Sequence, residues 1–157
     1  MRRILRVTWS VVLACTFAAE ASTQTLEKRV LSLEAAKRIA AAAEVAARAR
    51  GLGVVIAIVD DAGHLVLLHR LDDTQVASVQ VGIGKARTAA IYRRPSKVFE
   101  DQIKAGRVAA LALADSTPLQ GSIPITLDGK VVGAIGVSGD TPQVDEDIAI
   151  AGASAFK

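Results

Sequence analysis

The chain has very few of the side chains that carry thiol and imidazole chemistry. It contains one cysteine, Cys15, and two histidines, His64 and His69, in 157 residues. Cys15 lies in an N-terminal segment that we expect to be removed, which leaves the mature chain without a thiol. The sequence therefore excludes disulfides, Cys/His zinc sites and a Cys-His nucleophilic pair in the mature protein.

Aromatic residues and net charge are also low. Aromatics make up 3% of the chain, and 19 basic residues against 16 acidic ones give a net charge of +3. Removing residues 1–21 takes away three arginines and one glutamate, so that 16 basic and 15 acidic residues remain and the net charge is +1. Balanced charge and few stacking rings argue against nucleic acid as a partner.

The N-terminus has the layout of an export signal. Arg2 and Arg3 precede an uncharged apolar stretch over residues 7–18, and Ala19-Glu20-Ala21 has the small-x-small pattern of a cleavage site. The stretch is shorter than the roughly 20 residues that span a bilayer. We therefore predict a signal peptide over residues 1–21.

Three alternatives for this segment stay open: an uncleaved membrane anchor, a lipoprotein lipidated at Cys15, and export of the folded chain by the twin-arginine route. After cleavage we expect a periplasmic or secreted protein with no membrane association. A flexible lead-in over residues 22–31 and one domain over residues 32–157 complete the predicted organisation.

The hydrophobic pattern predicts two β-hairpins separated and flanked by helices. We expect Ser32 and Ser96 to cap the first and third helices and one of the residues 72–74 to cap the second, while residues 107–115 are compatible with either helix or strand. Hairpins layered with helices indicate an α/β protein with a mostly antiparallel sheet. The predicted helices cover residues 33–50, 76–94, 97–104 and 141–156, and the predicted strands cover residues 54–60, 64–70, 122–127 and 130–139.

Several glycines and one proline mark special positions within these elements. Gly82 and Gly84 inside the second helix, and Gly133 and Gly136 in the last strand, predict close approach of another backbone or of a flat ligand. The spacing of the strand glycines is not that of a nucleotide-binding loop. Pro124 lacks a backbone donor, which places its strand at a sheet edge or at a bulge.

The two histidines are the only candidate imidazole ligands. His64 and His69 are five positions apart, so they point to opposite faces of a regular strand and do not share one ion. Either one can serve as the axial ligand of a haem iron. The alternative is a polar surface residue at His64 and a hydrogen-bonded sheet histidine at His69.

Basic residues gather on and after the second helix. They can pair with carboxylates such as haem propionates, or they can form a solvated helix face. The set consists of Lys85, Arg87, Arg93 and Arg94.

Three acidic residues open the last helix. Asp145, Glu146 and Asp147 can complement the helix N-terminus, or they can bind iron or a cationic substrate. An enzyme that uses Asp145 and Glu146 as acid and base is a further hypothesis. We assign no catalytic residue, because the helix N-terminus explains these positions better.

Several segments, read together, resemble the GlcG/HbpS-like haem-degrading family over about residues 32–156. The block from Asp128 to Gly139 is the most specific of them. The chain departs from the family pattern at Gln120 and at Asp73-Thr74, and it lacks the Glu-x-x-Glu iron motif of some secreted members. The matching segments are residues 59–66, 70–72, 85–90, 121–125, 128–139, 145–146 and 151–152.

The resemblance implies a profilin-like three-layer α/β/α domain with a central, mostly antiparallel sheet, assembled into a homo-oligomer. It also implies binding of haem or a related tetrapyrrole, with slow haem degradation that comes from the iron rather than from a protein base. His64 or His69 would be the iron ligand, and Arg87 or Arg94 would pair with the propionates.

An alternative function is a binding or accessory module for a small organic acid or another metabolite, without haem. We expect such a module to place a polar pocket near Lys85, Thr88 and Gly121.

Overall fold

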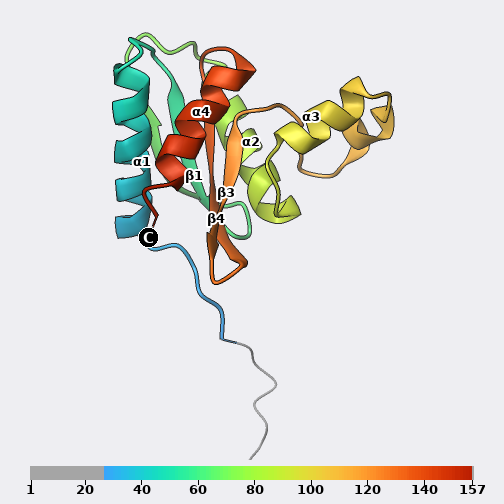
Figure 1. Cartoon of the computed structure of the whole chain (residues 1–157), viewed down its shortest axis with the longest axis horizontal. Coiled ribbons are helices and arrows are strands. Elements are labelled where there is room, and N and C mark those ends of the chain that lie inside the picture. Colours follow the sequence, from blue (N-terminus) through green and yellow to red (C-terminus); the bar gives the residue numbers. More distant parts are fainter. Residues whose placement is uncertain (1–26, 157) are drawn as a thin grey trace, which may run out of the picture.

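A computed structural model describes residues 27–156 and shows a four-stranded sheet with helices on both faces (Figure 1). The predicted signal peptide lies outside the described residues. Within residues 27–156, no helix is both long enough and apolar enough to cross a membrane. The elements in chain order are α1 (Leu33–Arg48), β1 (Val55–Asp60), β2 (Leu65–Arg70), α2 (Ser78–Tyr92), α3 (Lys97–Lys104), the 3-10 helix η1 (Val108–Ala112), β3 (Ser122–Leu127), β4 (Lys130–Ser138) and α4 (Pro142–Ala153).

The sheet consists of the two predicted hairpins joined through their first and last strands. The strand order is β2-β1-β4-β3, and every pair is antiparallel. Asp128 and Gly129 turn the second hairpin with φ of 49° and 74°, as a two-residue turn with two left-handed residues requires. Pro124 lies on the edge strand β3, as predicted.

Helices cover the sheet in two layers. Helices α1 and α4 pack together and cover one face, whereas α2 covers β1, β3 and β4 on the other face. The first five residues of β1 are buried, as its continuous apolar run predicts. The α/β fold class and the mostly antiparallel sheet are therefore confirmed.

Glycines allow α2 to lie very close to the sheet. A Cβ on Gly136 of β4 would lie 2.5 Å from the backbone nitrogen of Ala86 and would also meet the backbone oxygen of Gly82. The predicted close approach is thus between backbones of α2 and β4. A flat ligand has no access to this part of the strand, because the helix occupies it.

Three local predictions need correction. Helix α2 begins at Ser78, after Ala77, with no side-chain cap, because Thr74 uses its hydroxyl to donate to the Leu71 carbonyl. Ser96 does not cap α3: its backbone is helical, with φ −61° and ψ −25°, rather than extended as at an N-cap, and its hydroxyl donates to the Leu119 carbonyl. The ambiguous segment forms the short 3-10 helix η1.

The predicted cap of α1 and the end of the lead-in are both well defined. The Ser32 hydroxyl accepts the amide of Ala35, as expected for an N-cap. Leu31, the last residue of the predicted flexible lead-in, is buried, and its amide donates to the Val132 carbonyl at 3.2 Å. Leu31 therefore packs with the domain, and Lys28 and Arg29 of the predicted lead-in form ion pairs with Asp61 and Asp128.

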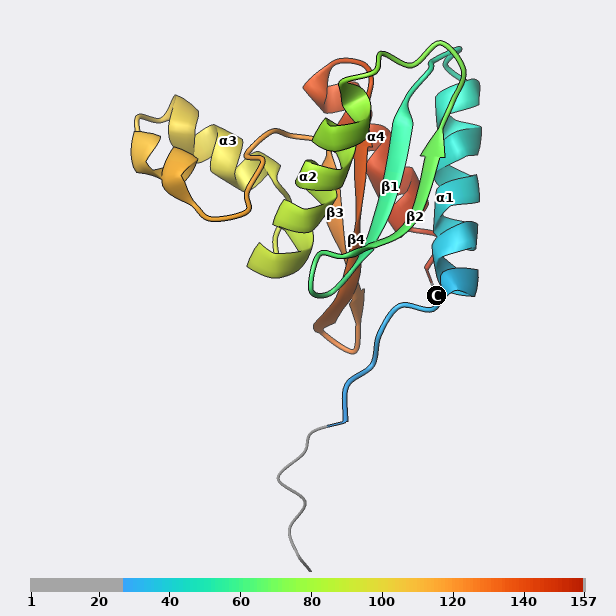
Figure 2. The ribbon, with the colours of Figure 1, turned by 180° about the vertical axis from the view of Figure 1, so that it is seen from behind.

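Residues 97–119, called the arm below, extend away from the sheet and its covering helices. Both ribbon views show α3 and η1 projecting sideways beyond α2 and β3 (Figure 2). Helix α3 packs against η1, so the arm forms a small unit of its own.

Candidate functional site

The edge strand β2 and the neighbouring flank of α2 carry apolar side chains on the same side of the sheet. The edge strand β2 stays uncovered beside α2 (Figure 2). Leu65 and Leu68 face the α2 side, because they pair with Val59 and Ala57, whose side chains belong to the core under α2. Leu65 is exposed and Leu68 is half-buried.

The flank of α2 contributes further side chains to this surface. Ile83 packs against the same small core as Leu68, and Ile91 and Arg87 approach the turn at Gly63. We call this surface the β2 ledge. It is formed by Leu65 and Leu68 of β2 and by Ile83, Arg87 and Ile91 of α2.

His64 stands at the end of the β2 ledge, just before β2 begins. Its side chain is 78% exposed, and its Nδ1 lies 3.5 Å from Oδ2 of Asp60. The other oxygen of Asp60 accepts the backbone amides of Ala62 and His64 at 2.9 and 2.8 Å, which fixes the turn. The turn thus fixes the backbone of His64, while its exposed ring keeps a nitrogen accessible to a ligand.

Arg87 joins α2 to the same turn. Its Nε donates to the Gly63 carbonyl at 3.3 Å. Gly63 has a φ of +85°, and a Cβ there would lie 2.7 Å from Cγ of Arg87, so the position requires glycine. Within residues 27–156 Arg87 forms no ion pair, so the remaining guanidinium N–H groups are available to a carboxylate.

His69 lies at the other end of β2 and on the other face. It pairs with Ile56, whose side chain belongs to the core under α1 and α4. Its Nδ1 lies 3.0 Å from Oε2 of Glu44 on α1, and its side chain is 35% exposed. The two histidines do not meet, and no group of three or more His, Cys, Asp or Glu side chains in the described part of the chain is placed to hold a metal ion.

Lys85 is buried rather than part of a solvated helix face. Its Nζ donates to Oδ2 of Asp145 at 2.8 Å and to the Val137 carbonyl at 3.1 Å. The side chains of Lys85 and Asp145 are 5% and 2% exposed. Burial raises the pKa of Asp145, although the Lys85 ammonium beside it acts in the opposite direction.

Gly121 closes the space around this ion pair. Its φ is +126°, and a Cβ there would lie 2.8 Å from Nζ of Lys85 and 2.9 Å from Cβ of Asp145. The structure therefore brings Lys85 and Gly121 together, as the organic-acid hypothesis requires. However, Asp145 already supplies the negative charge that Lys85 would offer to such a ligand.

The remaining predicted residues lie near the base of the arm. Thr88 is buried, and its Oγ1 accepts the amide of Thr117 at 2.7 Å and donates to the Gly84 carbonyl. The Arg94 guanidinium lies 5.8 Å from the ring centre of Phe99. Neither Thr88 nor Arg94 is among the residues that form the β2 ledge.

Sequence reasoning missed two features of this region. One is the partnership of Lys85 with Asp145, since Asp145 was explained by the helix N-terminus. A signal for it was present, because Lys85 follows Gly82 by three positions and so shares the glycine-bearing face of α2. The other is the orienting carboxylate of Asp60, which precedes His64 by four residues across the turn.

Comparisons with known proteins agree with this architecture. The family model described as "Haem degrading protein HbpS-like" matches residues 31–154. The protein GlcG of Escherichia coli strain K12 is 40% identical over 111 residues, which cover 71% of this chain and 83% of GlcG. The crystal structure of HbpS superposes with a TM-score of 0.81 at 30% identity, covering 85% of this chain and 95% of HbpS. The structure of the PduOC:heme complex superposes with a TM-score of 0.74 at 24% identity, covering 82% of this chain and 96% of PduOC, and supports the fold alone.

Proposed function

Because the chain belongs to the HbpS-like family of haem degrading proteins, we propose that it binds haem or a related tetrapyrrole on the β2 ledge, with His64 as the axial ligand. The observation that carries the proposal is an exposed imidazole, with a carboxylate oxygen 3.5 Å from its Nδ1, directly after the glycine whose carbonyl accepts from Arg87. Haem has an iron that an imidazole can bind, a flat apolar ring that can lie on leucine side chains, and two carboxylates that can pair with an arginine. The β2 ledge offers a side chain for each of these groups.

Each part of the ledge has a distinct task. Asp60 fixes the turn that carries His64 and lies 3.5 Å from its Nδ1, and the exposed imidazole would supply the ligand nitrogen. Leu65 and Leu68 supply an apolar wall for the ring. Arg87 is anchored through Nε to Gly63 and keeps its other N–H groups for a propionate, a geometry that favours bidentate pairing.

Haem degradation, where it occurs, draws on the oxygen chemistry that a bound haem iron supplies. The residues of the ledge contribute position and exposure. The 78% exposure of the His64 side chain would leave a haem bound there accessible to solvent. We therefore propose slow degradation as a secondary activity that depends on the exposure of the ligand.

We further propose that the chain is exported to the periplasm or secreted and works as a homo-oligomer. The basic start and short apolar stretch of residues 1–21 support export. Membership of the HbpS-like family supports assembly into a homo-oligomer. The mature chain would lack disulfides, so that packing between copies would stabilise the fold in place of covalent cross-links.

The organic-acid alternative has less support. It needs a free cation near Thr88 and Gly121, and the basic group that lies against Gly121 is Lys85, which is 4% exposed and paired with Asp145. We therefore favour haem as the ligand.

A hemin titration of the purified protein, followed by the Soret band, tests the proposal. We expect saturable binding by the wild-type protein and a loss of at least about tenfold in affinity for His64→Ala, which is about 1.4 kcal/mol. His69→Ala is the matched control, because His69 is a second imidazole beside a carboxylate on the opposite face. We expect this control to bind hemin like the wild type.

Arg87→Leu tests the propionate contact in the same titration. It retains the aliphatic stem against Gly63 and removes the charge, so we expect weaker binding with an unchanged Soret maximum. Absence of saturable hemin binding by the wild type would overturn the haem proposal. Loss of binding in His69→Ala but not in His64→Ala would move the ligand to the other face.

A further inference from the structure

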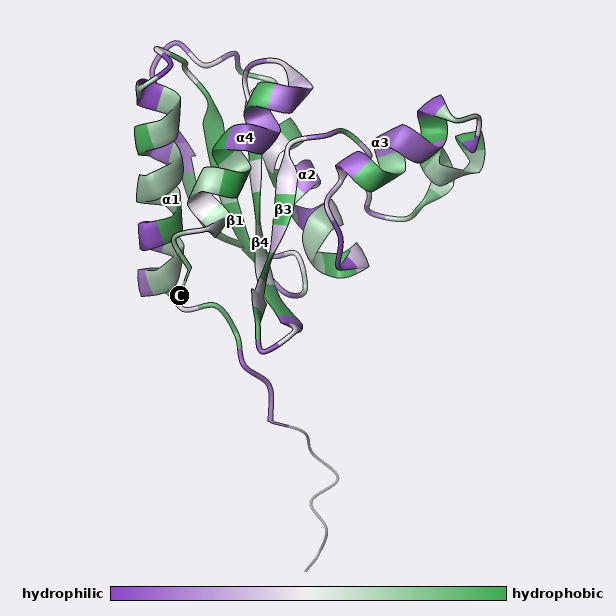
Figure 3. Ribbon diagram, viewed as in Figure 1, coloured by the Kyte–Doolittle hydropathy of each residue, from purple (hydrophilic) through white to green (hydrophobic). Residues whose placement is uncertain are grey.

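The lead-in to the domain runs past the turn that carries His64. Both hairpins turn at the same end of the sheet, and the lead-in reaches the domain at that end (Figure 1). Figure 3 shows hydrophilic colour on the first described residues of the lead-in and hydrophobic colour nearer the domain. Nζ of Lys28 in the hydrophilic part lies 2.7 Å from Oδ2 of Asp61. The turn of His64 therefore has a cation of the lead-in beside it.

This turn contacts two cations that come from different parts of the chain. Arg87 reaches it from α2, because its Nε donates to the Gly63 carbonyl at 3.3 Å. Lys28 reaches it from the lead-in, which continues to Leu31 in the core under α1 and α4. One cation is thus carried by the helix on one face of the sheet, and the other by a segment that packs on the opposite face.

The ammonium of Lys28 has capacity for a second carboxylate. Its side chain is 59% exposed, and an ammonium has three N–H groups with which to donate. Lys85 differs, since its side chain is 5% exposed and its Nζ donates to Asp145 and to the Val137 carbonyl. An exposed ion pair contributes little free energy, so Lys28 can turn toward a ligand at little cost.

The charges around His64 also require this second cation. Asp60 and Asp61 bring two carboxylates to the turn, and these repel the carboxylates of an approaching ligand. Arg87 alone balances only one of them. With Lys28 the two acidic and two basic side chains at the turn have no net charge, so that the propionates of a haem meet no overall repulsion.

We propose that Lys28 pairs with the second propionate of a haem bound at His64, while Arg87 pairs with the first. The inference rests on the haem binding proposed above and adds a residue of the lead-in to that site. The two propionates of haem leave neighbouring pyrrole rings at one edge of the macrocycle. The site therefore prefers tetrapyrroles that carry two free carboxylates at this edge.

Titration of the purified protein with hemin and with hemin dimethyl ester tests the contact, with both ligands in the same mixture of buffer and dimethyl sulfoxide. We expect Lys28→Met to bind hemin at least about threefold more weakly than the wild type does. The variant should bind the ester as well as the wild type does, because the ester has no free carboxylate. A merely structural role of Lys28 would weaken the binding of both ligands equally.

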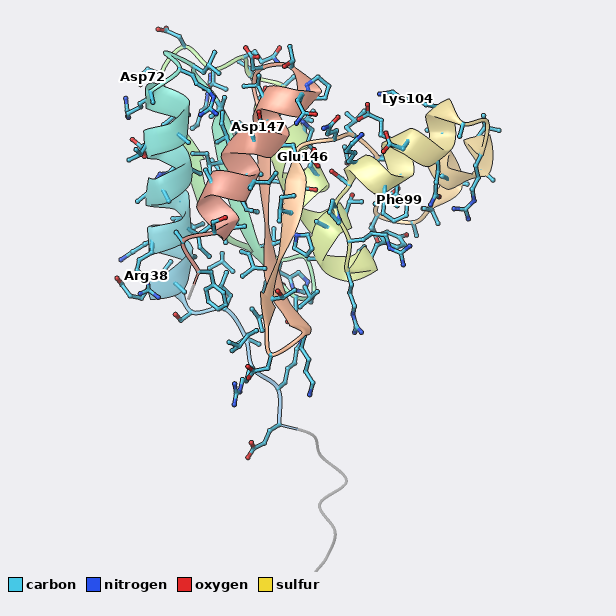
Figure 4. All side chains as sticks on the ribbon, viewed as in Figure 1. Arg38, Asp72, Phe99, Lys104, Glu146 and Asp147 are labelled. Atoms are coloured by element: carbon cyan, nitrogen blue, oxygen red, sulfur yellow. The ribbon has the colours of Figure 1, made fainter. Side chains whose placement is uncertain are left out.

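Two other cations provide matched controls. Arg29 is the next residue of the lead-in, and its guanidinium lies 2.7 Å from Oδ2 of Asp128 in the turn of the other hairpin. Arg38 lies on the outer side of α1, away from the sheet (Figure 4). We expect Arg29→Met and Arg38→Met to bind hemin like the wild type. An equal loss in Lys28→Met and Arg29→Met would overturn the inference, because the charge of the lead-in as a whole would then set the affinity.

The outcomes separate this inference from the haem proposal. A wild type that shows no saturable hemin binding would overturn both. A wild type that binds hemin, together with an unchanged affinity in Lys28→Met, would overturn the role of Lys28 alone.

The double variant Lys28→Met with Arg87→Leu tests whether the two cations pair with different propionates. Independent contacts predict that the two fold losses in hemin affinity multiply. A double variant that binds hemin no more weakly than Arg87→Leu would show that both cations act on one carboxylate, and it would contradict the assignment of a propionate to each.

Discussion

On the face covered by α1 and α4, β1 and β4 contribute Ile56, Ile58 and Ile135 to the core, whereas on the face covered by α2 they contribute Ala57, Ala134 and Gly136. On the first face these branched side chains pack against the alanines of α1. The second is closed by direct contact between backbones, with a buried ion pair at its border. Arg87 and Lys85, the basic residues of the candidate site, lie on α2 and therefore belong to the second face. The short distance between α2 and the sheet fixes their positions closely.

The largest expected difference between the faces comes from adding side-chain volume. Gly136→Val would place new carbon atoms against the backbone of Gly82 and Ala86, which cannot rotate away. We expect a loss of more than about 3 kcal/mol in the free energy of unfolding, or no folding at all. Urea denaturation with far-UV circular dichroism measures this loss.

Ile135→Val on the opposite face is the matched control for this substitution. It removes one methylene group from the aliphatic core, and we expect a loss of about 0.5–1.5 kcal/mol. Equal losses for Gly136→Val and Ile135→Val would show that the two faces tolerate a change in side-chain volume equally well.

Breaking the buried ion pair should have the next largest effect. Lys85→Met leaves Asp145 buried without its partner, and we expect a loss of about 3–5 kcal/mol in the free energy of unfolding. The double variant Lys85→Met with Asp145→Leu should recover a large part of this loss, because no unpaired charge remains. Urea denaturation of the three proteins gives the comparison.

A surface ion pair on the α1 side provides the contrast. Arg48 and Glu44 have side chains that are 62% and 25% exposed. Arg48→Ala should cost no more than about 1 kcal/mol. A loss for Lys85→Met as small as that for Arg48→Ala would mean that the buried pair is effectively solvated.

The sequence predicted the first face better than the second, and the reason is physical. The periodicity of large apolar residues such as Ile56 and Ile58 reports directly on burial, so the strands, the edge position of Pro124 and the fold class were confirmed. For Lys85 the signal is only indirect, the helix face that it shares with Gly82, and the composition of α2 does not show that Asp145 will meet Lys85 from a helix 60 positions away. The same holds for the role of Asp60 at His64, which depends on the geometry of one turn.

Removing one hydrogen-bonding hydroxyl on the α2 face should have a smaller effect than breaking its ion pair. Thr88→Val keeps the shape of the side chain and leaves the amide of Thr117 and the Gly84 carbonyl without this partner. We expect a loss of about 1–3 kcal/mol in the free energy of unfolding. Thr126→Val on the exposed part of β3 should change stability by no more than about 0.5 kcal/mol. Equal effects would show that the Thr88 contacts add nothing.

The smallest expected effect is a pH dependence on the α1 side. The hydrogen bond from Arg48 lowers the pKa of Glu44 below its ordinary value of 4.5, against a smaller opposing effect of burial, and His69 adds to the lowering. Glu44 therefore loses its proton more readily in the folded chain than in the unfolded one. Its contribution to stability is present above pH 4.5 and is lost as the pH falls through the folded pKa.

Glu44→Gln tests this dependence through urea denaturation at several pH values. The wild type should exceed the variant by no more than about 1 kcal/mol at pH 7, and the difference should shrink toward pH 3 because the wild-type carboxyl is then protonated as well. A difference that stays constant from pH 7 to pH 3 would show that Glu44 acts through packing rather than through charge. In that case the contact between Glu44 and His69 would be a neutral hydrogen bond, and the α1 side would owe its stability almost wholly to the aliphatic core.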